Sequence, residues 1–310
     1  MTAAPGCEMP GAAQLRPPLP SEADAIQAVW EASLGHDDPA SWPRGGWSVA
    51  AWATTSRVLL HDGRLIGVAA VRAELADDAT VPMRLALDPS LRQPALARAL
   101  VDAAVDLARA TGARRARLWL PTDATWAVDA AKQAGFRAVR SVAHMLLGAE
   151  VPTPTAPAVP GLHIRAIQPG EEDALLAALN RNWSGTWGFV PIPRAMLDQD
   201  LDGQRQGMLL GFLEPQPKIV ATCHAVYAPS EQNPDGHPRA WISNLTVDPE
   251  YRQRGIARAM LVAGIAHLRA RGARSITLGV DADDPAPMRL YRSAGFVVVS
   301  HQQAWDMQYN

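Results

Sequence analysis

The stretch VDPEYRQRGIARAML, residues 247–261, decides how the chain is interpreted, because an apolar strand ends there in a cationic, glycine-containing turn that opens directly into a helix. The pattern predicts a strand over residues 241–247, a turn over residues 248–255 and a helix that runs to about Arg271. Gly272 supplies the usual C-terminal stop. A strand, a turn and a helix in this order predict one unit of an α/β sheet.

The turn itself is predicted to bind an anion. Backbone N–H groups at a helix start have no partner inside the helix, and together with the positive end of the helix dipole they attract phosphate. Gly255 allows a phosphate to approach the backbone closely, and Arg252 and Arg254 add positive charge beside it. Without further support, an ordinary surface turn with two solvated arginines would explain these residues equally well.

The spacing Arg252-x-x-Gly255-x-Ala257 resembles the acyl-CoA signature of the GCN5-related N-acetyltransferases (the GNAT family), which binds the coenzyme A pyrophosphate. A second motif of that family, Asn-x-x-Ala-x-x-Leu-Tyr-x-x-x-Gly-Phe, resembles residues 281–296 of this chain, DADDPAPMRLYRSAGF. The two motifs together favour the resemblance over an ordinary surface turn. The positions that match the second motif are Leu290, Tyr291, Gly295 and Phe296.

The predicted order of elements is also that of the family: after the helix come a strand over residues 275–280, a helix over residues 285–294 and a strand from Phe296. The resemblance therefore implies an α/β fold of the α+β kind, in which a mixed central sheet is flanked by helices. It covers residues 15–147 and 162–309, is specific in the C-terminal motifs and is only architectural elsewhere.

Length and composition further limit the possible domain organisation and partners of the protein. At 310 residues the chain has room for two domains of about 150 residues each. A net charge of −2 with mixed acids and bases speaks against a nucleic-acid partner. Only Cys7 and Cys223 are present, so no disulfide framework and no cysteine metal site are expected. The N-terminus lacks a signal-peptide pattern and no apolar run reaches membrane-spanning length, so a soluble cytoplasmic protein without a membrane partner is expected.

The chain repeats itself. LDPSLRQPALARALV (residues 87–101) aligns with VDPEYRQRGIARAML, and two further blocks align at the same offset of 160 residues. A shared register over three blocks predicts a duplicated domain. The alternating prolines of AEVPTPTAPAVPG, residues 149–161, predict a semi-rigid extended linker between the copies. The expected organisation is a disordered lead (1–14), an N-terminal GNAT-like domain (15–148), the linker (149–161) and a C-terminal GNAT domain (162–310).

The N-terminal copy is expected to begin with a short strand from Leu15. A helix capped by Ser21 and ending near Leu34 and a Trp-, Gly- and Pro-rich loop over residues 35–47 are expected next. The elements predicted after the loop are a hairpin (57–60 and 65–74), a strand (81–87), a helix (95–110), a strand (115–120), a helix (124–134) and a closing strand (136–147).

The two copies differ where the resemblance places the chemistry. Gly255 is matched by Ala95, Arg254 by Pro94 and Tyr291 by Ala131. An alanine adds a Cβ where phosphate must approach, a proline removes a backbone N–H, and Ala131 has no hydroxyl. The N-terminal copy is therefore predicted to keep the fold but to be catalytically inactive. A variant coenzyme site in that copy is the alternative.

In this family acetyl-CoA and a primary amine usually bind together, and the amine attacks the thioester directly. By position, the resemblance implies that the backbone N–H of Leu245 faces the acetyl carbonyl and that Val247 hydrogen-bonds the pantetheine arm. Tyr291 matches the family's tyrosine near the coenzyme sulfur and is the candidate general acid, with a merely buried, packing tyrosine as the alternative. The residues whose N–H groups are expected to take the pyrophosphate are Gln253, Arg254, Gly255, Ile256 and Ala257.

Departures from the family pattern affect both ends of the site. The family's Asn is Asp284 here and its Ala is Pro287, so the helix could start late and a coenzyme contact could be lost. Several relatives carry a glutamate where this chain has Trp241. No general base is assigned from the sequence, and deprotonation through water is equally possible. The remaining candidates are His224, Asp281, Glu231 and Asp235.

The acceptor end is expected in the loop NRNWSGTWGFVPIP, residues 180–193, which in this fold lies over the acceptor groove. Trp183, Trp187 and Phe189 could hold an amine by stacking or cation–π contact, or could instead seal the interface between the two halves. The candidate acceptor-contacting residues on the central strand are Trp241, Ser243 and Asn244.

The resemblance implies an acetyl-CoA-dependent N-acetyltransferase that acts on the primary amine of a small molecule, and no metal is expected. Among tandem family members, the length, the linker and the altered N-terminal copy resemble mycothiol synthase-type two-domain acetyltransferases, which acetylate the cysteinyl amine of a sugar thiol. Those enzymes carry an acid at the position of Trp241, which leaves the acceptor open. A non-catalytic acyl-CoA-binding or sensing protein and a peptide or protein N-acetyltransferase remain alternatives, and the oligomeric state is open.

Overall fold

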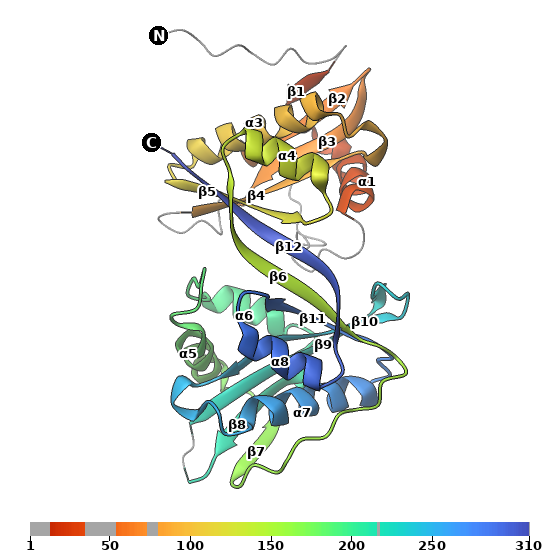
Figure 1. Ribbon diagram of the computed structural model, residues 1–310. Coiled ribbons are helices and arrows are strands. Elements are labelled where there is room, and N and C mark those ends of the chain that lie inside the picture. Colours follow the sequence, from red (N-terminus) through yellow and green to blue (C-terminus); the bar gives the residue numbers. More distant parts are fainter. Residues whose placement is uncertain (1–12, 35–53, 73–79, 216–217, 310) are drawn as a thin grey trace. The chain divides into compact units, whose positions relative to one another are not determined.

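The computed structural model describes residues 13–34, 54–72, 80–215 and 218–309 (Figure 1). The chain forms two compact units. The N-terminal unit consists of Met1–Ala143 with Ser300–Asn310, and the C-terminal unit consists of His144–Val299. The loop expected over residues 35–47 and most of the expected lead lie outside the described residues. Among the described residues, no helix is both long and apolar enough to cross a membrane.

The N-terminal unit follows the predicted order of elements closely. Its elements are β1 (Gln14–Arg16), the 3₁₀ turn η1 (Pro20–Glu22), α1 (Ala23–Leu34), β2 (Ser56–His61), β3 (Arg64–Val71), β4 (Thr80–Leu87), η3 (Pro89–Leu91), α3 (Pro94–Ala110), β5 (Arg115–Pro121), α4 (Thr125–Gln133) and β6 (Arg137–Leu147).

One local prediction in this unit is wrong: Ser21 does not cap the first helix, because it lies inside η1. The capping group is the Glu22 carboxylate, which accepts a hydrogen bond from the Leu19 N–H at 2.7 Å. The same carboxylate is held by Arg16 at 2.5 Å. The acid three residues after Leu19 therefore caps the 3₁₀ turn that precedes the helix.

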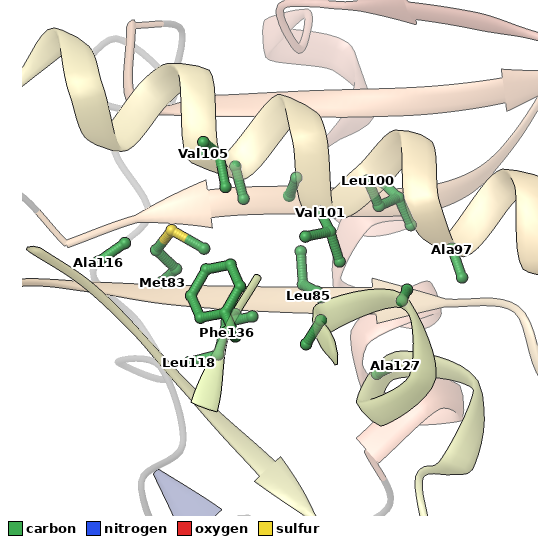
Figure 2. Packing of buried hydrophobic residues seen from close by; sticks show 14 of the residues in the cluster. Met83, Leu85, Ala97, Leu100, Val101, Val105, Ala116, Leu118, Ala127 and Phe136 are labelled. Carbon is green, nitrogen blue, oxygen red and sulfur yellow. The ribbon is translucent and has the colours of Figure 1, made fainter. Parts of the chain in front are cut away.

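The core of the N-terminal unit lies between α3 and the sheet (Figure 2). Apolar residues recur along α3 at helical spacing, so that Ala97, Leu100, Val101 and Val105 face β4 and β5. Phe136 closes the cluster just before β6 and is 3% exposed. The helix is thus fixed to the sheet by one continuous apolar stripe.

The C-terminal unit repeats this plan. Its elements are β7 (Leu162–Ala166), α5 (Glu172–Trp183), α6 (Arg194–Leu201), η4 (Arg205–Gly207), β8 (Met208–Leu213), β9 (Ile219–Gln232), β10 (Pro238–Val247), η5 (Pro249–Tyr251), α7 (Ile256–Ala270), β11 (Ile276–Asp281), α8 (Pro285–Ser293) and β12 (Val297–Gln308).

Helices cover both faces of the C-terminal sheet. On one face Gly264 of α7 lies against Cys223 of β9 and Ile242 of β10. On the other face Asn182 of α5 hydrogen-bonds Thr246 of β10. Because side chains alternate along a strand, Ala221, Cys223 and Ala225 of β9 face α7, whereas Thr222 and His224 face α5.

The last strand of each half contributes to both units, so the units do not coincide with the expected domains 15–148 and 162–310. In the N-terminal unit the strand order is β1-β2-β3-β4-β5-β12, and β12 pairs with β5 antiparallel from Gln302 to Gln308. Arg117 of β5 binds Asp306 of β12 at 2.7 Å. In the C-terminal unit the order is β6-β11-β10-β9-β8-β7, with the end of β6 beside β11.

The proline-rich segment 149–161 belongs to the C-terminal unit and contains no helix or strand. It runs along α7, where Arg258 Nε donates to the Thr155 carbonyl at 3.0 Å. Arg269 Nη2 donates to the carbonyls of Gly148 at 3.0 Å and Val151 at 3.1 Å. Two arginines of one helix therefore fix the segment at several points.

Candidate functional site

The turn before α7 presents a run of backbone donors. Gln253 and Gly255 adopt positive φ angles of 63° and 81°, so the chain enters the helix at Ile256 from a left-handed conformation. Within the described residues, the five successive N–H groups of Gln253, Arg254, Gly255, Ile256 and Ala257 donate to no protein acceptor. Consecutive donors at a helix start form a concave anion site.

Asp248 anchors the beginning of this turn. Its carboxylate, whose side chain is 2% exposed, accepts from Arg181 Nε at 2.9 Å and from Lys218 Nζ at 2.8 Å. It also accepts the Glu250 N–H at 3.1 Å. Burial opposes ionisation, but these hydrogen bonds outweigh it and hold the pKa of Asp248 below its ordinary value. The turn is therefore fixed by a buried, ionised carboxylate.

The two arginines expected beside the phosphate are partly engaged by the protein. Arg252 Nε donates to the Val247 carbonyl and Arg252 Nη2 donates to the Asn182 carbonyl, both at 3.2 Å. In the N-terminal unit Arg92 Nη2 makes the matching contact, to the Ser33 carbonyl at 2.8 Å. Because this arginine bonds the end of α1 in one copy and the end of α5 in the other, Arg252 has a structural role as well as a charge.

Arg254 lies at the surface of the turn. Its Nη2 donates to the Glu250 carbonyl at 3.2 Å, and its guanidinium stacks over the Tyr251 ring at 5.2 Å. Its charge remains beside the row of backbone donors, where it adds to the field that attracts an anion.

The central strand β10 carries a bulge next to the turn. Ser243 pairs with His224 and Thr246 pairs with Thr222, so Asn244 and Leu245 together oppose a single residue of β9. Asn244 has a φ of 47°, the left-handed conformation that asparagine tolerates better than most residues. The register of β10 with β11 is Trp241 opposite Thr277, ahead of the bulge. The backbone of Asn244 and Leu245 is thus turned out of the regular ladder, which resumes at Thr246 and Val247.

Tyr291 lies on α8 and is 8% exposed. Its ring meets Phe296 edge to face at 6.0 Å, and burial raises its pKa above the ordinary value, with the nearby Cys223 thiol adding to the rise. The hydroxyl therefore keeps its proton at neutral pH.

Asp284 acts as the N-cap of α8, since its Oδ1 accepts the Ala286 N–H at 2.9 Å. The helix begins at Pro285, so Pro287 does not delay its start. The departure from the family's Asn is therefore accommodated as a helix cap.

Three of the four candidate bases already have protein partners. Glu231 binds Arg239 at 2.8 Å, and Asp235 accepts from Ser275 Oγ at 2.9 Å. Asp281 accepts the Asp283 N–H at 3.0 Å. His224 is 3% exposed, faces the α5 side beside Ser243, and burial lowers its pKa to about 4.

The acceptor candidates fall into two groups. Trp183 ends α5 and packs against the apolar cluster between α5, α6 and β8. Trp187 is 38% exposed, and Phe189 is partly exposed nearby in the same loop. On β10, Trp241 and Ser243 share the face toward α5, and the Trp241 ring already stacks with Arg239 at 4.7 Å. The structure thus brings Trp241, Ser243 and Asn244 together on one strand.

The residues of the N-terminal unit that the structure describes lack both special backbone features. Its helix α3 begins at Pro94, so Ala95 is already helical, and the Gln93 N–H donates to the Leu91 carbonyl at 2.7 Å. Strands β3 and β4 pair without a register shift from Gly67 to Val71. Ala131 is fully buried in α4. Neither the donor row nor the bulge is therefore present in this unit.

The bulge is the functional feature that sequence reasoning missed. The signal was small: a Ser-Asn pair that interrupts the apolar strand at residues 243–244, with the asparagine suited to positive φ. The polar side chains of Thr222 and Asn182, which contact the bulge region, lie far away in the sequence and gave no signal at all.

Comparison with known proteins identifies the family of the chain. The model of the Acetyltransferase (GNAT) family matches residues 24–136 and again 173–296. A mycothiol acetyltransferase from Thermobispora bispora is 32% identical over 225 residues, which cover 68% of this chain and 71% of that protein. A mycothiol acetyltransferase from Propionibacterium freudenreichii is 29% identical, covering 90% of this chain and 85% of that protein.

Among solved structures, a GCN5-related N-acetyltransferase from Sphaerobacter thermophilus has the same fold, with a TM-score of 0.76, 22% sequence identity and 97% of each chain covered. Two copies of the family's fold, matched in succession along one polypeptide, account for the repeat of 160 residues. The chain belongs to the Acetyltransferase (GNAT) family as a tandem member, and it is an acyltransferase.

Proposed function

We propose that the C-terminal unit binds acetyl-CoA and transfers its acetyl group to the primary amine of a small molecule. One observation carries this proposal: the row of five backbone donors and the bulge in β10 occur at the two ends of one strand-to-helix connection. Both are absent from the described part of the N-terminal unit, which we propose to be catalytically inactive.

In this proposal the coenzyme lies along the end of β10. The pyrophosphate takes hydrogen bonds from the N–H groups of residues 253–257. Val247 bonds the pantetheine arm, and the charges of Arg252 and Arg254 stabilise the anion. Asp284 at the start of α8 lies at the family's coenzyme-contacting position.

The reaction needs no covalent enzyme intermediate. The amine nitrogen attacks the acetyl carbon, and the carbonyl oxygen becomes an oxyanion that accepts a hydrogen bond from the Leu245 N–H. The carbon–sulfur bond then breaks, the thiolate takes a proton from the Tyr291 hydroxyl, and the amide nitrogen gives up its extra proton to water, from which the tyrosinate is reprotonated. A buried tyrosine with a raised pKa keeps this proton until the thiolate forms.

We infer that the acceptor lies on the α5 side of β10. Trp241, Ser243 and Asn244 would contact it from the strand, and Trp183, Trp187 and Phe189 from the loop. The relatives named mycothiol acetyltransferase make an amine of the mycothiol type the first acceptor to test. The cysteinyl amine of a sugar thiol therefore belongs in the panel beside simpler amines.

The experiment is calorimetric titration of the full chain with acetyl-CoA, followed by an amine panel. A stoichiometry near one that Gly255→Asp abolishes supports the C-terminal site. A stoichiometry near two contradicts an empty N-terminal copy, as does transfer that survives in the Tyr291→Phe, Gly255→Asp double variant.

The panel separates the remaining alternatives. Binding without turnover of any amine would indicate an acyl-CoA-binding or sensing protein. Acetylation of peptides but not of free amines would indicate a peptide N-acetyltransferase.

A further inference from the structure

We propose that three buried side chains, Thr222, Thr246 and Asn182, form a positioning row that orients the peptide between Asn244 and Leu245 toward the acetyl group. The row joins β9, β10 and α5 within the C-terminal unit. This inference rests on the proposed function, because it assigns a cause to the geometry of the oxyanion donor. The three residues act through the backbone and are positioning residues.

The hydrogen bonds of the row run in one direction. Thr222 Oγ1 donates to the Asn244 carbonyl at 2.8 Å, which uses its single hydroxyl proton. The contact of 2.8 Å between Thr222 Oγ1 and Thr246 Oγ1 must therefore be donated by Thr246. Asn182 Nδ2 in turn donates to Thr246 Oγ1 at 2.9 Å. Every hydroxyl thus donates once and accepts once, so the orientation of each group is determined.

The row fixes the direction of the next backbone donor. In a planar trans peptide the C=O and the N–H point in opposite directions. Since the Asn244 carbonyl points at Thr222 on β9, the N–H of Leu245 points away from β9. The strand on that side of β10 is β11, whose registered pair with β10 is Trp241 opposite Thr277, ahead of the bulge. The Leu245 N–H is therefore aimed at the β11 side of β10, where we place the acetyl carbonyl.

The row also holds a backbone that would otherwise relax. Asn244 is in the left-handed conformation, which costs a residue with a side chain free energy unless its surroundings fix it. Thr222 is fully buried, Asn182 is 2% exposed and Thr246 is 6% exposed, so water does not replace these bonds easily. Loss of the Thr222 hydroxyl removes this hydrogen bond from the Asn244 carbonyl and allows the peptide to turn.

The row continues to the phosphate turn. The backbone carbonyl of Asn182 accepts from Arg252 Nη2 at 3.2 Å, and Arg252 Nε donates to the Val247 carbonyl at 3.2 Å. One hydrogen-bonded path thus connects the turn that would hold the pyrophosphate with the peptide that would hold the oxyanion. Both ends of the coenzyme would be positioned by the same buried network.

The test compares Thr222→Val with Thr222→Ser and with a matched control, Thr277→Val. Thr277 Oγ1 also donates to a β10 carbonyl, that of Ala240 at 3.3 Å, but ahead of the bulge. Because an oxyanion donor contributes to the transition state rather than to binding, Thr222→Val is expected to lower kcat about 10- to 100-fold while the KM for acetyl-CoA changes less than about threefold. Thr222→Ser, which keeps the hydroxyl, restores most of kcat, and Thr277→Val leaves it near the wild-type value.

A second readout is independent of turnover. In the wild type and in Thr222→Ser, acetyl-CoA should shift the amide resonance of Leu245 in NMR spectra, and in Thr222→Val that shift should be lost while coenzyme binding persists. A kcat for Thr222→Val within about twofold of wild type, or an equal loss in Thr277→Val, overturns this inference alone. A wild-type protein that does not bind acetyl-CoA overturns the proposed function as well.

Discussion

Replacing Gly255 by alanine separates the backbone cost of the phosphate turn from its role in binding. Gly255 has a φ of 81°, a conformation that costs an alanine about 1–2 kcal/mol. An added Cβ would lie 3.5 Å from Val159 Cγ2, which is an ordinary van der Waals contact, so no steric clash adds to that cost. The fold should therefore tolerate the change at a modest loss of stability.

The matched control is Gly272→Ala at the other end of α7. Gly272 has a φ of 95°, and its added Cβ would meet only the Tyr227 hydroxyl at 3.8 Å. The two variants carry a similar backbone strain, but only Gly255 lies inside the row of unpaired donors. A methyl group there obstructs the approach of a phosphate, so we expect the Kd for acetyl-CoA to rise at least about tenfold, or about 1.4 kcal/mol.

Calorimetric titration with acetyl-CoA and thermal unfolding measure the two effects separately. We expect similar Tm values for both variants and weakened binding for Gly255→Ala alone. Equal affinities in the two variants would refute the assignment of the coenzyme phosphate to this turn, whatever their stability.

Three further predictions concern single side chains. Tyr291→Phe should lower kcat about 10- to 100-fold with unchanged acetyl-CoA affinity. Because burial raises the pKa of Tyr291, deprotonation of its hydroxyl should not lower the wild-type rate below about pH 10, which a pH–rate profile would test. Asp248→Ala should lower the free energy of unfolding by about 1–3 kcal/mol, because it removes a buried carboxylate from its ion pairs with Arg181 and Lys218. The side chains of these two partners are 37% and 35% exposed. Folding lowers the pKa of Asp248, so the stabilisation by its carboxylate should be complete above the pKa that this group has in the unfolded chain. Denaturation curves should show the loss of this stabilisation as the pH falls through the lower pKa of the folded state. Asn244→Gly should keep stability within about 0.5 kcal/mol, whereas Asn244→Val should cost about 1–2 kcal/mol and lower kcat, because a β-branched residue resists a φ of 47°.

Much of the fold could be predicted from the sequence because the signals are local. The helix α7 begins after Gly255 and ends before Gly272, so its bounds depend on residues close in the chain. The helix α8, which carries Tyr291, is likewise predicted from a local motif. The hairpin turn at Asp62 and Gly63 is of the same kind, with positive φ at both residues. These boundaries agree with the structure to within a few residues.

The remaining features depend on contacts between distant residues. Thr222 and Asn182 become important only when β9 and α5 bring them to the bulge, and a threonine on a strand is unremarkable by itself. The engagement of Arg252 with two carbonyls could not be read from a motif that assigns arginines to phosphate. The alternation of apolar and polar residues along β12 also does not show which strand it pairs with, because several strands would suit it equally well.

The placement of β12 has a consequence for synthesis on the ribosome. Residues 300–308 supply the edge partner of β5, and Trp305 completes the core of the N-terminal unit. The half of the chain that is translated first must therefore wait for residues 302–308, which follow α8 in the chain, before β5 has this partner strand. Until then β5 lacks this partner, so removal of residues 302–308 would harm the earlier-translated unit more than the one that carries the proposed active site.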